Sequence, residues 1–415
     1  MSDSSARPLR ILSLAPTSFF NDYGCHVRIL EEVRALQALG HDVTVVTYHK
    51  GHDVPGVRIV RTAPTPWRAN YEVGSSRHKF IFDLLLGLTL LQVLAAAARC
   101  GERYDVVHGH LHEGALIGGV IGRLFGLPVC FDFQGSLTDE MIMHRFIRSG
   151  SIAHEIFRRL ERIIERLPHA VVTSTAHAAE KLRAELPADV RVQALPDGVD
   201  LDGRLNLVVD PGERAARRAA LGVGPDDVLV VYLGLLAPHQ GIGNLIEAAV
   251  ASRGHAHVRW LVMGYPQEEL WRAAAVQAGV ADRMIFTGRV PYDQMPLMLA
   301  LGDIAAAPKL SLSEGSGKIL NYMALGLPTV AFDTPAQREI LGDLGVYVPL
   351  GDSAAFAGRV TELAAEPERR AALGAQLRVR VRERFTWQAG ARVLVDVYRS
   401  MMGSEPRRGL VGGAR

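Results

Sequence analysis

The chain has 415 residues, 48% of them hydrophobic, and a formal net charge of +2. At roughly 150 residues per domain, this length predicts two or three domains with well-filled apolar cores. The near-neutral balance indicates neither a nucleic-acid partner nor an acidic solvating protein. Three widely spaced cysteines, Cys25, Cys100 and Cys130, favour free thiols over a disulfide framework or a zinc site. Together with a polar first segment that lacks a secretory pattern, they predict a cytoplasmic protein.

The first half of the chain alternates buried strands with helices. A strand at 9–16, a loop at 17–25, a helix at 27–39 and a strand at 41–47 form a βαβ unit, which implies a parallel sheet. The loop offers Gly24 without a Gly-x-Gly-x-x-Gly array, which argues against a nicotinamide or flavin enzyme. Further strands are predicted at 57–61, 105–110, 128–132, 170–174 and 190–195.

Two helical segments of this half admit two interpretations each. The apolar run 80–98 is interrupted by polar residues and is predicted as a buried helix beside the sheet, with a membrane span or a shallow membrane contact as alternatives. In 152–167 an apolar stripe recurs at helical spacing and is predicted to face the core, with four arginines outside it. The alternative for this helix is a basic amphipathic surface that meets anionic lipid or a polyanionic acceptor. The stripe consists of Ile152, Ile156, Leu160, Ile163 and Leu167, and the arginines are Arg158, Arg159, Arg162 and Arg166.

The predicted strand at 105–110 ends among three histidines, His108, His110 and His112. Alternate positions at a strand end can point imidazoles in similar directions, so a metal site is one hypothesis for them. Packing at the strand end is the other hypothesis.

A second βα series follows the interval 197–227, which breaks the periodicity and is predicted to separate two domains. Strands are expected at 227–234, 257–264, 284–288, 303–308 and 329–332, with helices at 241–251, 267–278, 291–301 and 318–325. The predicted fold class is α/β, with two Rossmann-like domains that face each other across a cleft. The domains are expected at 1–200 and 201–384, followed by a closing helix at 385–402 and a disordered tail at 403–415.

The stretch 310–333 is predicted to hold a phosphate. Gly315, Ser316 and Gly317 precede the helix that begins near Lys318, so free N–H groups and the positive end of a helix dipole face the loop. Glu314 and Lys318 then lie at the mouth of an anion site, where one can grip hydroxyls and the other can neutralise charge. The only Asp-x-Asp sequence, at 200–202, falls in the interdomain turn, so binding without a metal is expected.

The order of an acidic residue, Gly-x-Gly, a short helix, Met-Ala-x-Gly-x-Pro and an apolar strand resembles the donor-sugar site of retaining glycosyltransferases of family four, the glycosyl transferases group 1 type. The resemblance spans 9–402 and implies the GT-B fold, in which a closing helix crosses back to the N-terminal domain. It further implies transfer of a sugar from a nucleoside-diphosphate sugar, with UDP or GDP expected, to a glycan, a lipid-linked or a small-molecule acceptor. Configuration is retained, and neither a metal nor another cofactor is required.

The resemblance also implies roles for individual residues. His110 approaches the transferred sugar, Glu314 grips its hydroxyls and Lys318 holds the leaving diphosphate. The donor site is completed by Gly24, Gln240, Gly315, Ser316, Gly317 and Asn321, the last near the ribose. Gln134 and Ser136 line the acceptor side.

The chain departs from the family pattern at three positions. Leu235 and Gln240 stand where the family usually supplies an arginine and a lysine, and Asn321 stands in place of a second glutamate. Because two phosphates need charge compensation, Lys318 is the expected substitute. Two alternatives remain open: a catalytically impaired pseudo-transferase that acts as a binding subunit, and a nucleotide-sugar epimerase. The expected location is the cytoplasm, with a peripheral contact at the inner face of the membrane as a further hypothesis.

Overall fold

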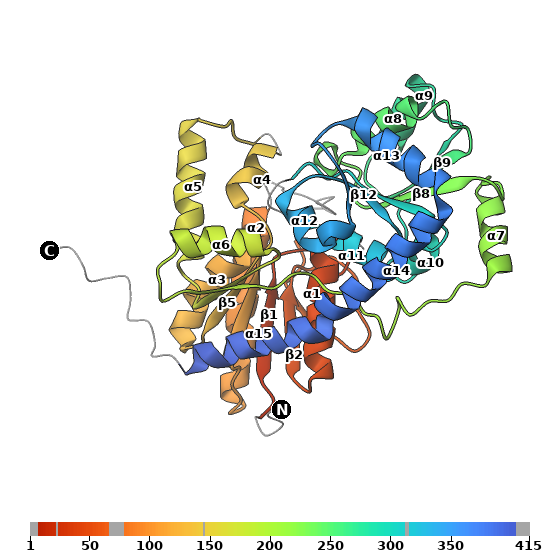
Figure 1. Ribbon diagram of the computed structural model, residues 1–415. Coiled ribbons are helices and arrows are strands. Elements are labelled where there is room, and N and C mark those ends of the chain that lie inside the picture. Colours follow the sequence, from red (N-terminus) through yellow and green to blue (C-terminus); the bar gives the residue numbers. More distant parts are fainter. Residues whose placement is uncertain (1–6, 22–23, 66–78, 144–145, 312–314, 404–415) are drawn as a thin grey trace.

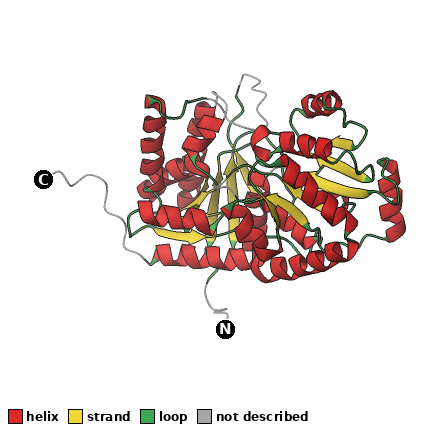
Figure 2. Ribbon diagram, turned by 45° about the horizontal axis from the view of Figure 1, so that its top comes forward, coloured by secondary structure: helices red, strands yellow, loops and turns green. Residues whose placement is uncertain are grey.

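The computed structural model describes residues 7–21, 24–65, 79–143, 146–311 and 315–403. Figure 1 shows two α/β units side by side, and Figure 2 shows strands in the interior of each with helices around them. The prediction for Glu314, and that for nearly all of the tail at 403–415, lie outside the described residues.

The N-terminal unit is built on a seven-stranded sheet whose strand order is β3-β2-β1-β4-β5-β6-β7. Every neighbouring pair in this sheet is parallel, as the βαβ pattern predicts. The strands are β1 (Arg10–Ala15), β2 (Asp42–Thr47), β3 (Arg58–Arg61), β4 (Val106–His110), β5 (Val129–Phe133), β6 (Ala170–Thr173) and β7 (Arg191–Ala194).

The second unit is built on a six-stranded parallel sheet in the order β10-β9-β8-β11-β12-β13. In both units the order reverses beside the first strand of the series, which is the point where open α/β sheets bind ligands. The strands are β8 (Val228–Leu233), β9 (Val258–Met263), β10 (Met284–Gly288), β11 (Ile304–Ala307), β12 (Thr329–Phe332) and β13 (Val346–Val348).

Helices connect the strands and cover both faces of each sheet (Figure 2). In the N-terminal unit they are α1 (Gly24–Ala38), α2 (Lys79–Arg99), α3 (Leu111–Phe125), α4 (Leu137–Met143), α5 (Ile152–Glu165) and α6 (Ala176–Glu185). Then come α7 (Pro211–Ala220), the 3₁₀ turn η1 (Pro238–Gln240), α8 (Ile242–Ala251), α9 (Glu268–Gln277), α10 (Met295–Leu299), α11 (Gly317–Ala324), α12 (Pro335–Leu341), η2 (Gly342–Leu344), α13 (Ser353–Ala365), α14 (Pro367–Arg384) and α15 (Trp387–Met402). The interval 197–227, predicted to separate the units, therefore contains α7, and α10 is shorter than the helix expected at 291–301.

The last helix, α15, lies on the N-terminal unit (Figure 1). It packs against α1, and its apolar side chains, Leu394 and Tyr398 among them, share a core with residues of β1 and β2. On the opposite face of the same sheet, α2, α3 and α5 contribute to two further cores. The sheet is thus a middle layer between α1 and α15 on one side and α2, α3 and α5 on the other.

The prediction that the stripe of α5 faces the core is wrong for four of its five residues. Ile152, Ile156, Leu160 and Ile163 are exposed, whereas Leu167, just beyond the helix, is buried. The inward side carries Glu161, Ile164 and Glu165 instead. This is possible because Glu161 accepts hydrogen bonds from the Leu137 N–H and the Thr138 hydroxyl of α4, so the carboxylate is satisfied inside.

The helix at 80–98, predicted to be buried, is buried along one side only. Among the described residues, α2 is long and apolar enough by length and composition to span a bilayer. In the structure it lies along β2, β3 and α3, and one side, formed by residues such as Phe82, Leu86 and Leu90, is buried against the sheet. Its other side is exposed at Phe80, Leu84 and Leu88.

Candidate active site

A cavity of about 470 Å³ lies between the two units. Its N-terminal wall comes from the loops after β1, β4, β5 and β6, and its second wall from the loops after β8, β9 and β11 and from the start of α11. Both sheets therefore present the carboxyl ends of their strands to the same space, as expected for ligand sites in open α/β folds. Of the residues predicted for the site, the lining includes Gly24, Gln134, Ser136, Gln240, Gly315, Ser316, Gly317, Lys318 and Asn321.

The start of α11 forms an anion-binding surface on the second wall. Ser316 is the N-cap residue, but its side chain caps no N–H group of the helix. Its hydroxyl is buried and has no hydrogen-bond partner within the described part of the chain. By contrast, side chains cap α5, α6, α7, α12, α13 and α15. The Ile319 N–H donates to the Ser316 carbonyl, so the N–H groups of Gly317 and Lys318 and the Ser316 hydroxyl are the groups that a negatively charged ligand can contact.

Lys318 extends from the first turn of α11 to the loop after β8. Its Nζ donates to the Gln240 side-chain oxygen at 3.0 Å and lies 4.5 Å from the centre of the Tyr232 ring. Within the described ranges, which omit 312–314, no carboxylate forms an ion pair with it. Burial, and secondarily the charge of Lys309, lowers the pKa of Lys318 to about 7. A bound diphosphate would restore the charged form by supplying the missing negative charge.

The contact between Lys318 and Gln240 explains how the second wall keeps a cation. Gln240 occupies the position where the family resemblance implies a lysine, and Lys318 brings an ammonium to the same point from a different helix. Lys309 also lines the cavity and donates to the Gly315 carbonyl at 2.9 Å. Sequence reasoning missed Lys309, although its position just after the β11 strand was a usable signal.

Gly234, at the end of β8, makes room for the Lys318 side chain. A Cβ atom at this position would lie 2.5 Å from Lys318 Nζ. We expect Gly234→Ala to displace the ammonium and to weaken nucleoside-diphosphate binding roughly tenfold, comparable to losing a hydrogen bond to a charged group. Isothermal titration calorimetry with the diphosphate measures this change. The control is Gly358→Ala on α13, where a Cβ meets no atom within 4 Å, and equal affinities for both variants would contradict the prediction.

His110 does not line the cavity. Its ring is 1% exposed and lies behind the N-terminal wall, where Nδ1 is 2.9 Å from the Asp132 carboxylate and Nε2 is 3.0 Å from the Ser13 hydroxyl. The ring also stacks on His108 with centroids 4.4 Å apart. Of the three histidines around the end of β4, the one that lines the cavity is His112. In this structure, therefore, the His110 side chain supports the wall, and the predicted contact of His110 with the sugar stays a prediction.

Leu111, the residue after His110, has an unusual backbone conformation at the cavity wall. Leu111 opens α3 with φ of 59° and lines the cavity. A positive φ is uncommon for residues other than glycine, and such residues concentrate at functional sites. The sequence carries no signal for this conformation, because nothing at 111 distinguishes leucine from an ordinary helix residue.

A buried ion network forms part of the same wall, and two of its members, Arg28 and Asp197, line the cavity themselves. Arg28 of α1 contacts three carboxylates: Glu32 at 3.1 Å, Asp132 at 2.9 Å and Asp197 at 2.7 Å. Burial alone would raise the pKa of Asp132, but the charge of Arg28 brings this pKa below its usual value. For Glu32 burial dominates, and its pKa is raised well above the usual value. Asp132 also accepts from the Gln134 amide at 2.7 Å, so this network holds a residue that lines the cavity.

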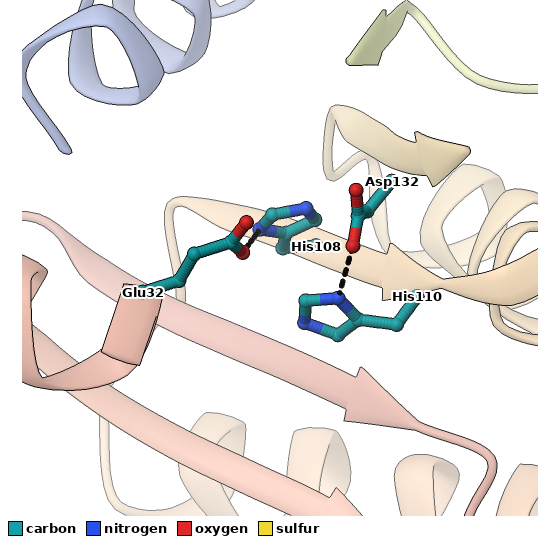
Figure 3. A group of neighbouring side chains, drawn as sticks. All are labelled: Glu32, His108, His110 and Asp132. Atoms are coloured by element: carbon teal, nitrogen blue, oxygen red, sulfur yellow. Dashed lines mark hydrogen bonds and ion pairs between the residues drawn. The ribbon is translucent and has the colours of Figure 1, made fainter. Parts of the chain in front are cut away.

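Figure 3 shows the part of this network that resembles a metal site. Glu32, His108, His110 and Asp132 place one possible ligand atom each within 4.8 Å of one another. However, the Arg28 guanidinium already contacts both carboxylates, so a divalent cation bound there would lie against a fixed positive charge. The donor set fits an ion-pair network better than a metal centre.

His112 belongs to a second group, with Glu161 and Glu165 of α5, rather than to the other two histidines. Its Nε2 lies 3.5 Å from Glu161 and 3.9 Å from Glu165. The three histidines therefore do not converge on one point. Since both oxygens of Glu161 accept hydrogen bonds from α4, this group joins α3, α4 and α5 beneath the cavity.

The predicted acceptor side is polar. Gln134 and Ser136 line the cavity, and Ser136 Oγ also accepts from the Asp139 N–H at 3.1 Å, which caps the start of α4. Glu113 lines the same wall in an ion pair with Lys79, whose charge lowers the pKa of Glu113 despite the opposing effect of burial. Hydroxyl groups of an acceptor would find both donors and acceptors here.

Comparison with known proteins agrees with this geometry. The glycosyl transferase 4-like domain matches residues 23–198, and the glycosyl transferases group 1 family matches residues 227–366. The chain belongs to this family of glycosyltransferases, and its two facing sheets form the GT-B fold. The family and the fold implied by the donor motif are thereby confirmed, as is the expectation of an enzyme that uses a nucleotide sugar.

Three similar proteins illustrate the family. The chain is 29% identical over 377 residues to the 2-deoxystreptamine N-acetyl-D-glucosaminyltransferase of Streptomyces fradiae, covering 85% of each chain. It is 28% identical over 404 residues to the D-inositol 3-phosphate glycosyltransferase of Xylanimonas cellulosilytica, covering 93% of each. The structure of HepE from Anabaena in complex with UDP-glucose has a TM-score of 0.73 at 16% identity, covering 94% of this chain and 100% of that one.

Proposed function

We propose that this glycosyltransferase moves a sugar from a UDP-sugar to a small polyhydroxylated acceptor, with retention and without a metal. The observation that supports it most is the second wall, where Lys318, the Ser316 hydroxyl and the uncapped start of α11 converge on the cavity. A cation and free N–H donors in one place stabilise the charge that develops on a departing diphosphate. That role requires no divalent ion.

The acceptor class rests on the N-terminal wall and on the relatives. Two relatives are named for transfer to 2-deoxystreptamine and to D-inositol 3-phosphate, both of which are small ring polyols. The polar groups of Gln134, Ser136 and Glu113 suit the hydroxyl groups of such an acceptor. The sequence allowed a glycan, a lipid-linked or a small-molecule acceptor, and of these we propose the small molecule.

In this mechanism the side chains and N–H groups of the site position the substrates and neutralise the charge of the leaving diphosphate. Lys318 and the α11 N–H groups hold the leaving diphosphate in the orientation that the transfer needs. The described residues include no side chain that we assign as a general base. As the family resemblance implies, we propose that the departing phosphate takes the acceptor proton as the new bond forms on the same face of the sugar.

A thermal-unfolding panel of UDP, GDP, ADP, CDP and dTDP tests the donor site. UDP is expected to stabilise the protein by about 2.7 kcal/mol at a concentration of 100 Kd, equally with magnesium and with EDTA. The effect should shrink in Lys318→Ala and persist in Lys181→Ala, a matched exposed lysine on α6. A requirement for magnesium, or stabilisation by none of the nucleotides, would contradict the proposed donor site.

Product analysis separates the proposal from its two alternatives. Incubation of a UDP-sugar with aminocyclitol or inositol phosphate acceptors should give a glycoside of unchanged anomeric configuration. UDP binding without turnover across acceptors would instead favour the pseudo-transferase. An isomerised nucleotide sugar formed without acceptor would favour the epimerase.

A further inference from the structure

The outward surface of the helices α2, α3 and α5 concentrates exposed apolar side chains. Of the eighteen large apolar residues that are exposed in the described part of the chain, ten lie on these three helices. The helices are neighbours, with α3 in contact with both α2 and α5, and they cover one face of the seven-stranded sheet. We call this surface the helical face. Isolated exposed apolar residues are ordinary, but a concentration of them marks an interaction surface.

Each helix contributes a stripe with a spacing of one turn. On α2 the stripe is Phe80, Leu84 and Leu88, with Phe80 79% exposed. On α3 it is Leu116, Val120 and Leu124, with Leu124 75% exposed. Because positions four apart share one side of a helix, each stripe is a continuous ridge that points away from the sheet.

The helix α5 has three distinct sides. One side packs inward through Ile164 and the two buried glutamates. The second carries the apolar stripe, in which Ile152 is 83% and Ile156 is 57% exposed. The third side holds Arg158, Arg159 and Arg162, with Arg166 directly after the helix. An apolar stripe beside a row of arginines is the arrangement of helices that lie in a membrane interface.

The charges on α5 distinguish between two possible partners of the helical face, a lipid surface and a second copy of the chain. Glu155 is the only carboxylate of α5 outside its inward side, and it lies near Arg158 and Arg159 in exposed ion pairs of small energetic value. On this side of α5 itself, three arginines, Arg158, Arg159 and Arg162, stand against one carboxylate, which leaves the edge positive. A second copy of the chain would bring two positive edges together, whereas an anionic lipid surface attracts them.

We propose that the helical face docks the protein on an anionic membrane surface, with the apolar ridges in the interface and the arginines at the lipid headgroups. The chain would lie on the membrane rather than span it, because α2 also lies against the sheet through its inward side. This proposal concerns the location of the protein and is independent of the donor and acceptor proposed above.

Flotation with vesicles of phosphatidylcholine, with or without phosphatidylglycerol, tests the docking of the full chain. Wild type should bind the anionic vesicles, bind the neutral ones weakly, and detach as salt is raised. The double variant Arg158→Gln/Arg159→Gln should bind about 25-fold more weakly, since each arginine contributes roughly fivefold near an anionic surface. Ile156→Glu/Ile163→Glu should abolish binding.

The control is Val276→Glu on α9, which places a carboxylate at an equally exposed apolar position of the second unit. It should leave vesicle binding unchanged, and thermal stabilisation by UDP should be the same in all variants. Absence of binding to anionic vesicles would overturn the proposal, as would equal binding to neutral ones. Size-exclusion chromatography supplies another decisive result: a dimer that Ile156→Glu/Ile163→Glu makes monomeric would show that the face pairs copies of the chain.

Discussion

Replacement of Lys318 by methionine is expected to lower kcat/KM by about 10²- to 10³-fold, the usual cost of removing one group that stabilises transition-state charge. The loss should be large because Gln240 and Leu235 provide no charge in the loop after β8. Steady-state kinetics with the UDP-sugar measures it. Lys181→Met on α6 is the control, and an unchanged kcat/KM in Lys318→Met would mean that the diphosphate is held elsewhere.

The same lysine should couple donor binding to pH. In the free protein the pKa of Lys318 is lowered to about 7, so the side chain is largely neutral above that pH. A bound diphosphate favours the ammonium, so binding takes up a proton, and affinity should fall up to tenfold per pH unit above about 7. Calorimetric titrations of UDP in two buffers of different ionisation heat count this proton. The uptake should vanish in Lys318→Met.

Replacement of Arg28 by methionine is expected to cost about 3–5 kcal/mol of unfolding free energy, because it leaves buried carboxylates without their cation. Glu32 and Asp132 both lose an ion pair in this variant, and Asp197 loses a contact of 2.7 Å. Urea unfolding followed by circular dichroism measures the change. Arg34→Met on the same helix should cost no more than about 1 kcal/mol, because Arg34 is partly exposed and its partner Glu31 keeps an ion pair with Arg204.

The loss of unfolding free energy in Arg28→Met should become smaller at low pH. The pKa of Asp132 is lower in the folded than in the unfolded chain, so its ion pair stabilises the fold above the unfolded pKa and loses this effect as pH falls. Protonation also relieves the repulsion that Arg28→Met creates. The difference between variant and wild type should therefore shrink as the pH is lowered below the unfolded pKa of an aspartate. A constant difference across pH would show that packing, not charge, dominates.

The sequence was informative where local pattern decides structure. The parallel sheets follow from short apolar strands that alternate with helices, and the proposed donor site was placed by the glycines at 315 and 317 before a helix. Lys318, which we propose as the substitute for the missing cation, was also visible in the sequence as a lysine at a helix start. The contact that makes it effective, with Gln240, joins residues 78 positions apart and required the structure.

Other parts of the site could not be predicted because they depend on which side of an element is covered. The burial of His110 follows from the carboxylate of Asp132 on the neighbouring strand and from Ser13 on another. In α5 the periodicity identified the apolar stripe correctly but not its direction, because two buried glutamates find partners on α3 and α4. Periodicity alone cannot distinguish an apolar side that faces the core from one that faces a partner.

The return of α15 to the first unit has a consequence for synthesis of the protein. The apolar side of α1 is covered by residues 387–402, and Tyr398 of this helix lies 2.6 Å from His108 on β4. A nascent chain that has emerged from the ribosome through β7 therefore holds every strand of the first sheet but lacks part of its core. That surface stays open to water, or to a chaperone, until the whole second unit has been translated. The N-terminal unit, which is synthesised first, therefore completes its core last.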